Sequence, residues 1–248
     1  MLEPVPTGYF FLFLSFFLVL TFRLLGWTWL ERVLALIALI ANGLLLGAIW
    51  AMSGHLPVFN LFESFLLTVF ILGIIALIFT ETSPARSWIR TWIWAEVILL
   101  FGILLFYPKI HAPQRFYDKD LYVVLFHLSR TVALAVMLLA SGFYAEFLRT
   151  SRRSSSQEDS LHIGRNFLIL GTILFLISEF AGILWCLNGW GDFWRWNYGF
   201  LSSTFIMLYL MLVFHLPGKG LVSKRMTSIT GTMNSLVFLG IAVSRSVP

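Results

Sequence analysis

Long apolar runs separated by short polar segments dominate the pattern of the chain. A helix needs about 20 apolar residues to cross the hydrocarbon core of a bilayer. Eight runs meet that length, near residues 8–26, 33–52, 62–80, 88–107, 121–147, 166–187, 197–216 and 228–244. They are apolar at nearly every position instead of alternating with period two, and a chain in lipid must satisfy its own backbone hydrogen bonds. The pattern predicts an all-α integral membrane protein, a bundle of about eight transmembrane helices.

The composition supports this class. Hydrophobic residues make up 59% of the chain and charged residues only 12%, with a mean hydropathy of +0.87. One soluble core cannot hide so much apolar surface. We therefore expect a single transmembrane domain over residues 1–248. The first run has no Lys or Arg ahead of it and no small-residue cleavage pattern behind it, so we expect a retained helix and not a signal peptide.

The distribution of Lys and Arg predicts the orientation. Eleven of the 17 basic residues fall in or beside the segments that follow the first, third, fifth and seventh runs, whereas five fall on the opposite side. Because cytoplasmic loops carry the excess of basic residues, both termini are expected on the outer (periplasmic) side. Residues 149–165 form the expected basic cytoplasmic loop. The net charge of +5 is mostly this topological signal and gives no reason to invoke nucleic acid.

A Trp-rich segment, "NGWGDFWRWNYGF", occupies residues 188–200 and is expected in an outer loop between the sixth and seventh runs. Tryptophan is enriched at membrane interfaces, so an aromatic belt accounts for many of the 10 tryptophans. This segment also carries an acid, a base and glycines, which a belt does not need. Its functional candidates are Trp190, Trp194, Trp196 and Arg195, and the acid is Asp192.

The five histidines divide by their setting. His127 and His215 lie within apolar runs, where an ionisable side chain is costly and by default marks a function. His55 and His111 are expected toward the outer side, and His162 in the solvated cytoplasmic loop. Neutral imidazole is a normal axial ligand for haem iron. A broad Trp surface beside a helix-borne imidazole therefore suits a porphyrin.

The anionic edge of a porphyrin needs cations. Arg130 follows His127 by one turn on the same helix face, and Arg195 lies in the Trp-rich loop, so both are candidates for pairing with propionates. An equally weighted alternative for Arg130 is an ion pair with Glu179 of the sixth run or Glu96 of the fourth. The sequence leaves these alternatives open.

These residues resemble a known family. "WGDFWRWN", followed by an apolar run ending in "YLMLVFH", is similar to the Trp-rich (WWD) motif of the haem-handling membrane proteins of cytochrome c biogenesis. The closest pattern is that of the CcsA (ResC) proteins of the Ccs system, with the CcmC type a second member. "GHLPVFNLFES", which contains His55, and "FHLSRTVALAVMLLASG", around His127, are similar to CcsA segments that precede the third span and open the fifth. The likeness covers most of the chain.

The resemblance implies roles for individual residues. His127 would be an axial ligand of a non-covalently bound haem b that lies against a platform of Trp190, Trp194 and Trp196. His215 would ligate a second, intramembrane haem whose other ligand comes from a partner protein or a fused domain. His55 joins the candidate cofactor-binding residues at the outer face, although the likeness does not make it an iron ligand.

Two departures from the family pattern matter. Asn197 stands where the Trp motif ends in Asp, and Ser244 stands where CcsA proteins carry a further outer histidine. Bis-histidine ligation of the outer haem would then need His111 or His55 as a substitute. The missing histidine leaves the second axial ligand open.

Several chemistries are excluded by what the sequence lacks. Cys186 is the only cysteine, so the chain has no C-x-x-C-H motif for covalent haem, no thiol pair and no iron–sulfur ligand set. It also has no G-x-x-x-x-G-K-[ST] phosphate-binding loop. Any haem bound here would be non-covalent.

Two function classes follow, with a third as a fallback. The first is a haem-handling component of the bacterial cytoplasmic (inner) membrane, which presents haem outward for cytochrome c maturation alongside a Ccs-type partner. Any enzymatic role would be as a component of a cytochrome c haem lyase. The second is a b-haem electron-transfer subunit that links quinol to a periplasmic cytochrome c. The third is a scaffold of such a complex without haem.

Overall fold

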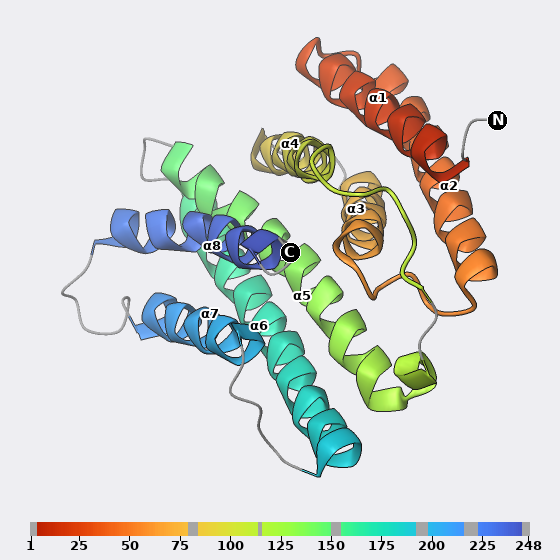
Figure 1. Ribbon diagram of the computed structural model, residues 1–248. Helices are drawn as coiled ribbons and strands as arrows, with labels where there is room; N and C mark the ends of the chain where they lie inside the picture. The colour runs from red at the N-terminus through yellow and green to blue at the C-terminus, as the bar shows by residue number, and fades with distance from the viewer. Residues whose placement is uncertain are drawn as a thin grey trace. The chain divides into compact units, whose positions relative to one another are not determined.

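The computed structural model describes residues 4–78, 84–113, 116–149, 155–191, 198–215 and 223–244, and within these ranges it contains helices and no strands (Figure 1). The α-helices are α1 (Pro4–Leu24), α2 (Thr28–Ser53), α3 (Leu61–Ile78), α4 (Pro84–Leu104), α5 (Leu121–Arg149), α6 (Ser155–Trp190), α7 (Tyr198–His215) and α8 (Lys224–Ser244). A short 3-10 helix, η1, covers Phe116–Lys119. The predicted all-α class is confirmed.

Most of these helices have the length and composition of membrane spans. α1, α2, α3, α5, α6 and α8 each contain an apolar stretch long enough to cross a bilayer, and the apolar stretch Leu201–His215 of α7 is shorter. Each of the eight predicted runs corresponds to one α-helix. The chain is therefore a multi-pass membrane protein. The outward orientation of its termini stays a prediction.

Part of the expected basic loop at residues 149–165 is helical. α5 continues to Arg149 and α6 begins at Ser155, so residues 155–165 are helical. The expected outer loop at 188–200 is shortened in the same way, because α6 ends at Trp190 and α7 begins at Tyr198. Hydropathy marks only the part of a helix that suits lipid, whereas backbone hydrogen bonding continues into polar residues beyond it.

The chain divides into two compact units, Met1–Lys119 and Asp120–Pro248. That the two units form a single transmembrane domain stays a prediction. In the first unit α1 packs against α2 and α4, and α3 packs against α2 and α4. Buried positions recur along α1 every three or four residues, at Val5, Tyr9, Leu12, Phe16 and Val19. This spacing gives α1 one inward face and leaves the other face to lipid.

A buried ion cluster joins three helices of the first unit. Glu31, at the start of α2, is fully buried and accepts the indole N–H of Trp94 at 2.8 Å. The same carboxylate pairs with Arg90 Nε of α4 at 2.8 Å and with Arg23 Nη1 of α1 at 3.5 Å. Arg23 also donates to Thr91 Oγ1 at 3.1 Å. Two buried cations therefore pair with one carboxylate.

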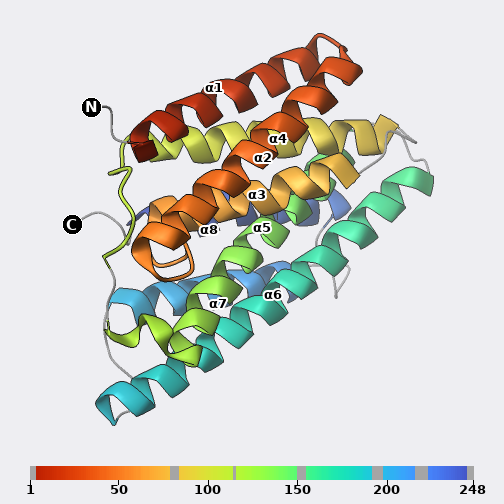
Figure 2. The same cartoon turned by 90° about the vertical axis from the view of Figure 1, so that its right-hand side faces the viewer.

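In the second unit, α5 is the central helix. It packs against both α6 and α8, and α7 packs against α8 (Figure 2). Nearly every residue of α5 from Ser129 to Phe147 is buried. Its first part, which includes Phe126 and His127, has mostly intermediate exposure, and its last two residues, Leu148 and Arg149, are exposed. The candidate haem ligand therefore lies in an accessible segment of α5.

Close packing of α5 and α8 depends on Gly231. A Cβ added there would lie 2.5 Å from the ring of Tyr144, whereas a Cβ at Gly240, on the same helix, meets nothing within 4 Å. We expect Gly231→Ala to destabilise the protein by about 1–3 kcal/mol through overpacking. Gly240→Ala should leave stability unchanged or slightly raised. Thermal unfolding in detergent checks this pair, and equal melting temperatures would contradict the packing described.

Candidate functional site

The accessible segment of α5 forms an aromatic cluster with α6. The His127 ring lies 6.4 Å from the Trp185 ring, centroid to centroid, and the Phe126 ring lies 5.8 Å from the same indole. Gly182, one turn before Trp185, makes room for this packing, because a Cβ there would come within 2.9 Å of the Phe126 ring. His127 and Trp185 are both half-buried. An imidazole beside an indole offers an iron ligand next to an aromatic surface.

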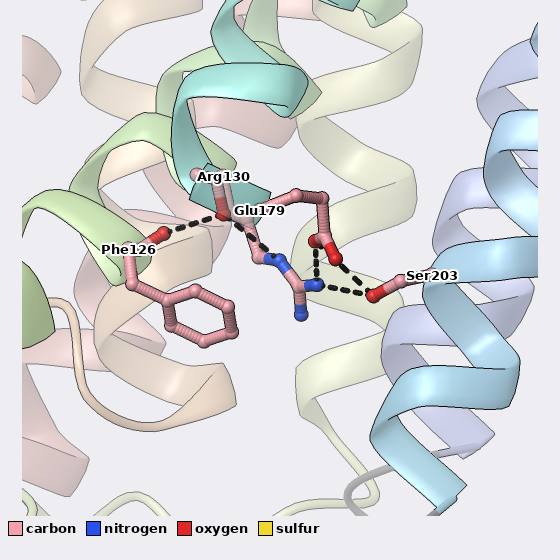
Figure 3. Close-up of polar contacts among 5 residues, drawn as sticks. Phe126, Arg130, Glu179 and Ser203 are labelled. Carbon is pink, nitrogen blue, oxygen red and sulfur yellow. Dashed lines mark hydrogen bonds and ion pairs between the residues drawn. The ribbon is translucent and has the colours of Figure 1, made fainter. Parts of the chain in front are cut away.

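One turn along α5, Arg130 lies at the centre of a polar cluster that links three helices (Figure 3). Its Nη2 forms an ion pair with Glu179 Oε1 of α6 and donates to Ser203 Oγ of α7 at 2.5 Å. Its Nε donates to Ser178 Oγ at 3.1 Å. Ser203 also donates to Glu179 Oε1 at 3.1 Å. α5, α6 and α7 are thus connected through one guanidinium.

Phe126 ties the aromatic and polar clusters together. Its ring lies under the Arg130 guanidinium, with Cζ 4.2 Å from the ring centroid. Its carbonyl accepts a hydrogen bond of 3.0 Å from Ser178 Oγ, which itself accepts from Arg130. The cation–π contact and the hydrogen bonds fix Arg130 on the face of α5 that carries His127.

The structure shows one of the alternatives that the sequence left for Arg130, the ion pair with Glu179. Its ion-pair partner is Glu179, whereas Glu96 accepts the indole N–H of Trp92 at 2.7 Å within α4. The side chains of Arg130 and Glu179 remain 17% and 26% exposed. A propionate would therefore have to share Arg130 with a carboxylate already in place. Its pairing with propionates stays a prediction.

His215 is exposed at the last residue of α7. Its Nδ1 lies 2.7 Å from the Met211 carbonyl, one turn earlier on the same helix. A carbonyl only accepts, so Nδ1 carries the hydrogen and the lone pair of Nε2 is left for another group. Metal-ligating histidines commonly donate their second nitrogen to a backbone carbonyl in this way. The geometry fits the expected iron ligand that a partner completes.

His55 is held differently. It follows α2 directly, is only 4% exposed, and has a carbonyl oxygen 2.9 Å from each ring nitrogen. Neither nitrogen is available to an iron in this arrangement. That His55 contributes to cofactor binding at the outer face stays a prediction. Any such contribution would be in a role other than axial ligand.

The Trp platform falls largely beyond what the structure describes. Trp190 is the last residue of α6, whereas Trp194, Arg195 and Trp196 lie outside the described residues. Ser244 is the last residue of α8. The platform role of the three tryptophans and the propionate role of Arg195 remain predictions.

Sequence reasoning missed Ser178, Ser203 and Trp185. Ser203 lies in a run that the hydropathy pattern treats as uniformly apolar, and its partner is 73 residues away along the chain. Trp185 lies inside the sixth apolar run, where a tryptophan does not stand out from its apolar neighbours. Two features of the sequence could have indicated it. Gly182 lies three residues before Trp185, on the same helix face, and Phe126 directly precedes His127 in the fifth run.

Haem binding requires an iron ligand and cations near the propionates. Haem iron needs one or two protein ligands, and imidazole is a common one. His127 offers an imidazole beside an indole, and His215 offers one with a fixed tautomer. Arg130 supplies a cation close to His127 on the same helix. These residues fit a non-covalent haem.

A comparison with curated proteins identifies a relative of the chain. No protein-family model matches the chain. Among curated proteins the chain is similar to Protein NrfI of Wolinella succinogenes, with 28% identity over 212 residues. The match covers 79% of this chain and 22% of NrfI. The chain thus spans about a fifth of the length of this relative.

Proposed function

We propose that this chain is a haem-handling component of cytochrome c maturation. It would bind haem b non-covalently and present it on the outer face of the bacterial inner membrane. The observation that carries the proposal is the half-buried imidazole of His127, packed beside Trp185 and one turn from Arg130. The likeness to Protein NrfI suggests a role in cytochrome c maturation at the level of the family. The resemblance of the Trp-rich segment to CcsA proteins agrees with it.

Haem is the cargo in this proposal, and the residues of the chain hold and orient it. His127 would hold the iron through its imidazole. Trp190, Trp194 and Trp196 would contact the porphyrin face, and Arg195 would pair with a propionate. Arg130 already pairs with Glu179 and donates to Ser203. Its role would be to hold the haem-facing turn of α5 in place and to keep that turn positively charged.

The proposal requires other polypeptides. The chain matches 22% of NrfI, so the apocytochrome-binding and redox parts of the process would be supplied by a Ccs-type partner or by a periplasmic cytochrome c. The exposed imidazole of His215, whose Nε2 lone pair is left free by the Met211 hydrogen bond, is suited to share an inner haem with such a partner.

A second function, a b-haem subunit that passes electrons from quinol to a periplasmic cytochrome, is favoured by specific sequence departures. Asn197 and Ser244 replace two family features that serve a haem-releasing site. Loss of those features suits a haem that stays bound. The third reading, a scaffold without haem, predicts none of the spectra described next.

The visible spectrum of the purified protein in detergent tests these functions. We expect a reduced-minus-oxidised difference of b type, with all haem extractable by acidified organic solvent because none is covalently attached. Under the assembly proposal, added quinol does not reduce the haem, and added apocytochrome c with its partner proteins removes it. Rapid reduction by quinol would favour the electron-transfer function. Protein purified without haem from haem-replete membranes would refute both.

A further inference from the structure

Three side chains between the end of α2 and the first turn of α3 bind a distant backbone segment, residues 110–113. The Asn60 amide donates to the Ile110 carbonyl at 3.0 Å. The Ala112 N–H donates to Glu63 Oε1 at 2.6 Å, and the Ala112 carbonyl lies 2.9 Å from His55 Nε2. The peptide groups on both sides of His111 are therefore fixed.

The hydrogen-bond partners of His55 favour the protonated ring. Its Nδ1 faces the Leu56 carbonyl and its Nε2 faces the Ala112 carbonyl, each at 2.9 Å. Carbonyl oxygens only accept hydrogen bonds, and neutral imidazole has one N–H. In the neutral form one nitrogen lone pair would point at a carbonyl oxygen in a site shielded from water. Both contacts are hydrogen bonds only when the ring is an imidazolium.

Carboxylates compensate this buried charge. Glu63, at the start of α3, is fully buried and accepts the backbone N–H of Phe59 at 2.9 Å in addition to that of Ala112. Asp118 of η1 is also buried. The negative charges of Asp118 and Glu63 both favour the protonated form of His55. Burial alone lowers the pKa of His55, but the two carbonyls and the two carboxylates outweigh it and raise the pKa above its ordinary value.

We infer that His55 is a charged latch: as an imidazolium it fastens residues 110–113, and with them His111, and its deprotonation releases them. The latch is independent of the proposed haem function. Because the folded-state pKa is raised, the stabilisation is complete at acidic pH and is lost as the pH rises through the folded-state value. The half-buried ring of His111 would be presented in one position only while the latch is closed.

Nuclear magnetic resonance of the full chain in detergent, with ¹⁵N-labelled histidine, tests the protonation state. The His55 signal is assigned by its loss in His55→Leu, and His162→Gln, which changes an exposed histidine on α6, is the matched control. We expect the His55 titration midpoint to lie above the ordinary value of about 6.5, with both ring nitrogens carrying hydrogen below that midpoint. Glu63→Gln should lower that midpoint. A single neutral tautomer at pH 6 would overturn the inference.

Hydrogen–deuterium exchange of the peptide that contains residues 110–113 tests the release. After correction for the intrinsic pH dependence, exchange in the wild type should rise about tenfold or more across the His55 titration. His55→Leu should exchange rapidly at every pH, and His162→Gln should match the wild type. If His55→Leu fails to fold, Glu63→Gln decides the matter, because it should shift the rise to lower pH. Exchange that does not change across the titration would contradict the latch.

Discussion

Replacing Glu31 with leucine is expected to destabilise the first unit more than any other single change considered in that unit. Glu31 is fully buried and is the carboxylate that pairs with Arg90 and Arg23, whose side chains are 1% and 5% exposed. Removing it leaves two buried guanidinium groups without this counter-charge. The loss of one partner of a buried ion pair costs roughly 3–5 kcal/mol. The melting temperature in detergent should fall by about 10 °C.

Matched variants separate charge from packing at this site. Arg32→Leu changes the exposed next residue of α2 and should leave the melting temperature close to the wild type. Glu31→Gln keeps an acceptor for the Trp94 indole and should cost less than Glu31→Leu. The double variant Glu31→Leu with Arg90→Met removes one of the two guanidinium groups that lost Glu31 and should recover part of the loss. Equal melting temperatures for Glu31→Leu and Arg32→Leu would show that the cluster does not stabilise the fold.

The second large effect is expected from Glu179→Leu. Arg130 would keep its donors to Ser178 and Ser203 but lose its anionic partner. Because the pair is 17% and 26% exposed, the cost should lie between about 1 kcal/mol for an exposed pair and roughly 3–5 kcal/mol for a buried one. The Arg130 guanidinium would then be able to pair with another carboxylate, such as a haem propionate. Haem occupancy should therefore be retained or increased while thermal stability falls.

Two further variants show why Glu179→Leu changes stability and haem occupancy. Arg130→Leu together with Glu179→Leu should recover stability relative to Glu179→Leu, because no uncompensated charge remains. Arg130→Leu alone should lower haem occupancy if the cation assists binding. The measurements are the melting temperature and the haem-to-protein ratio of each purified variant. A fall in both quantities for Glu179→Leu would indicate that Glu179 itself supports the haem site.

Helix positions could be predicted from the sequence because the apolar runs are long and uniform. Each run corresponds to one helix, and α5 and α7 match their predicted ranges within two residues at either end. α6 was predicted to begin at residue 166 but begins at Ser155. Hydrogen bonding along a helix does not stop where polar residues begin, so hydropathy underestimates the helix there.

The partners of the site residues could be predicted only in part. Arg130 and His127 share a helix, so their proximity follows from spacing alone. The choice of Glu179 over Glu96 depends on which helices pack together, and that is not encoded in periodicity. The contact of His55 with Ala112 joins positions 57 residues apart, and nothing in the local pattern of either segment indicates it.

The most direct test of the central claim is the reduced-minus-oxidised spectrum of the full chain with single histidine replacements. His127→Ala and His215→Ala are compared with His162→Ala, which removes an exposed histidine from α6. We predict that His127→Ala abolishes most of the b-type signal, whereas His162→Ala leaves it unchanged and His215→Ala reduces it only where a partner completes an inner haem. An undiminished spectrum in His127→Ala, with protein folded as the wild type, would contradict the proposed haem site on α5.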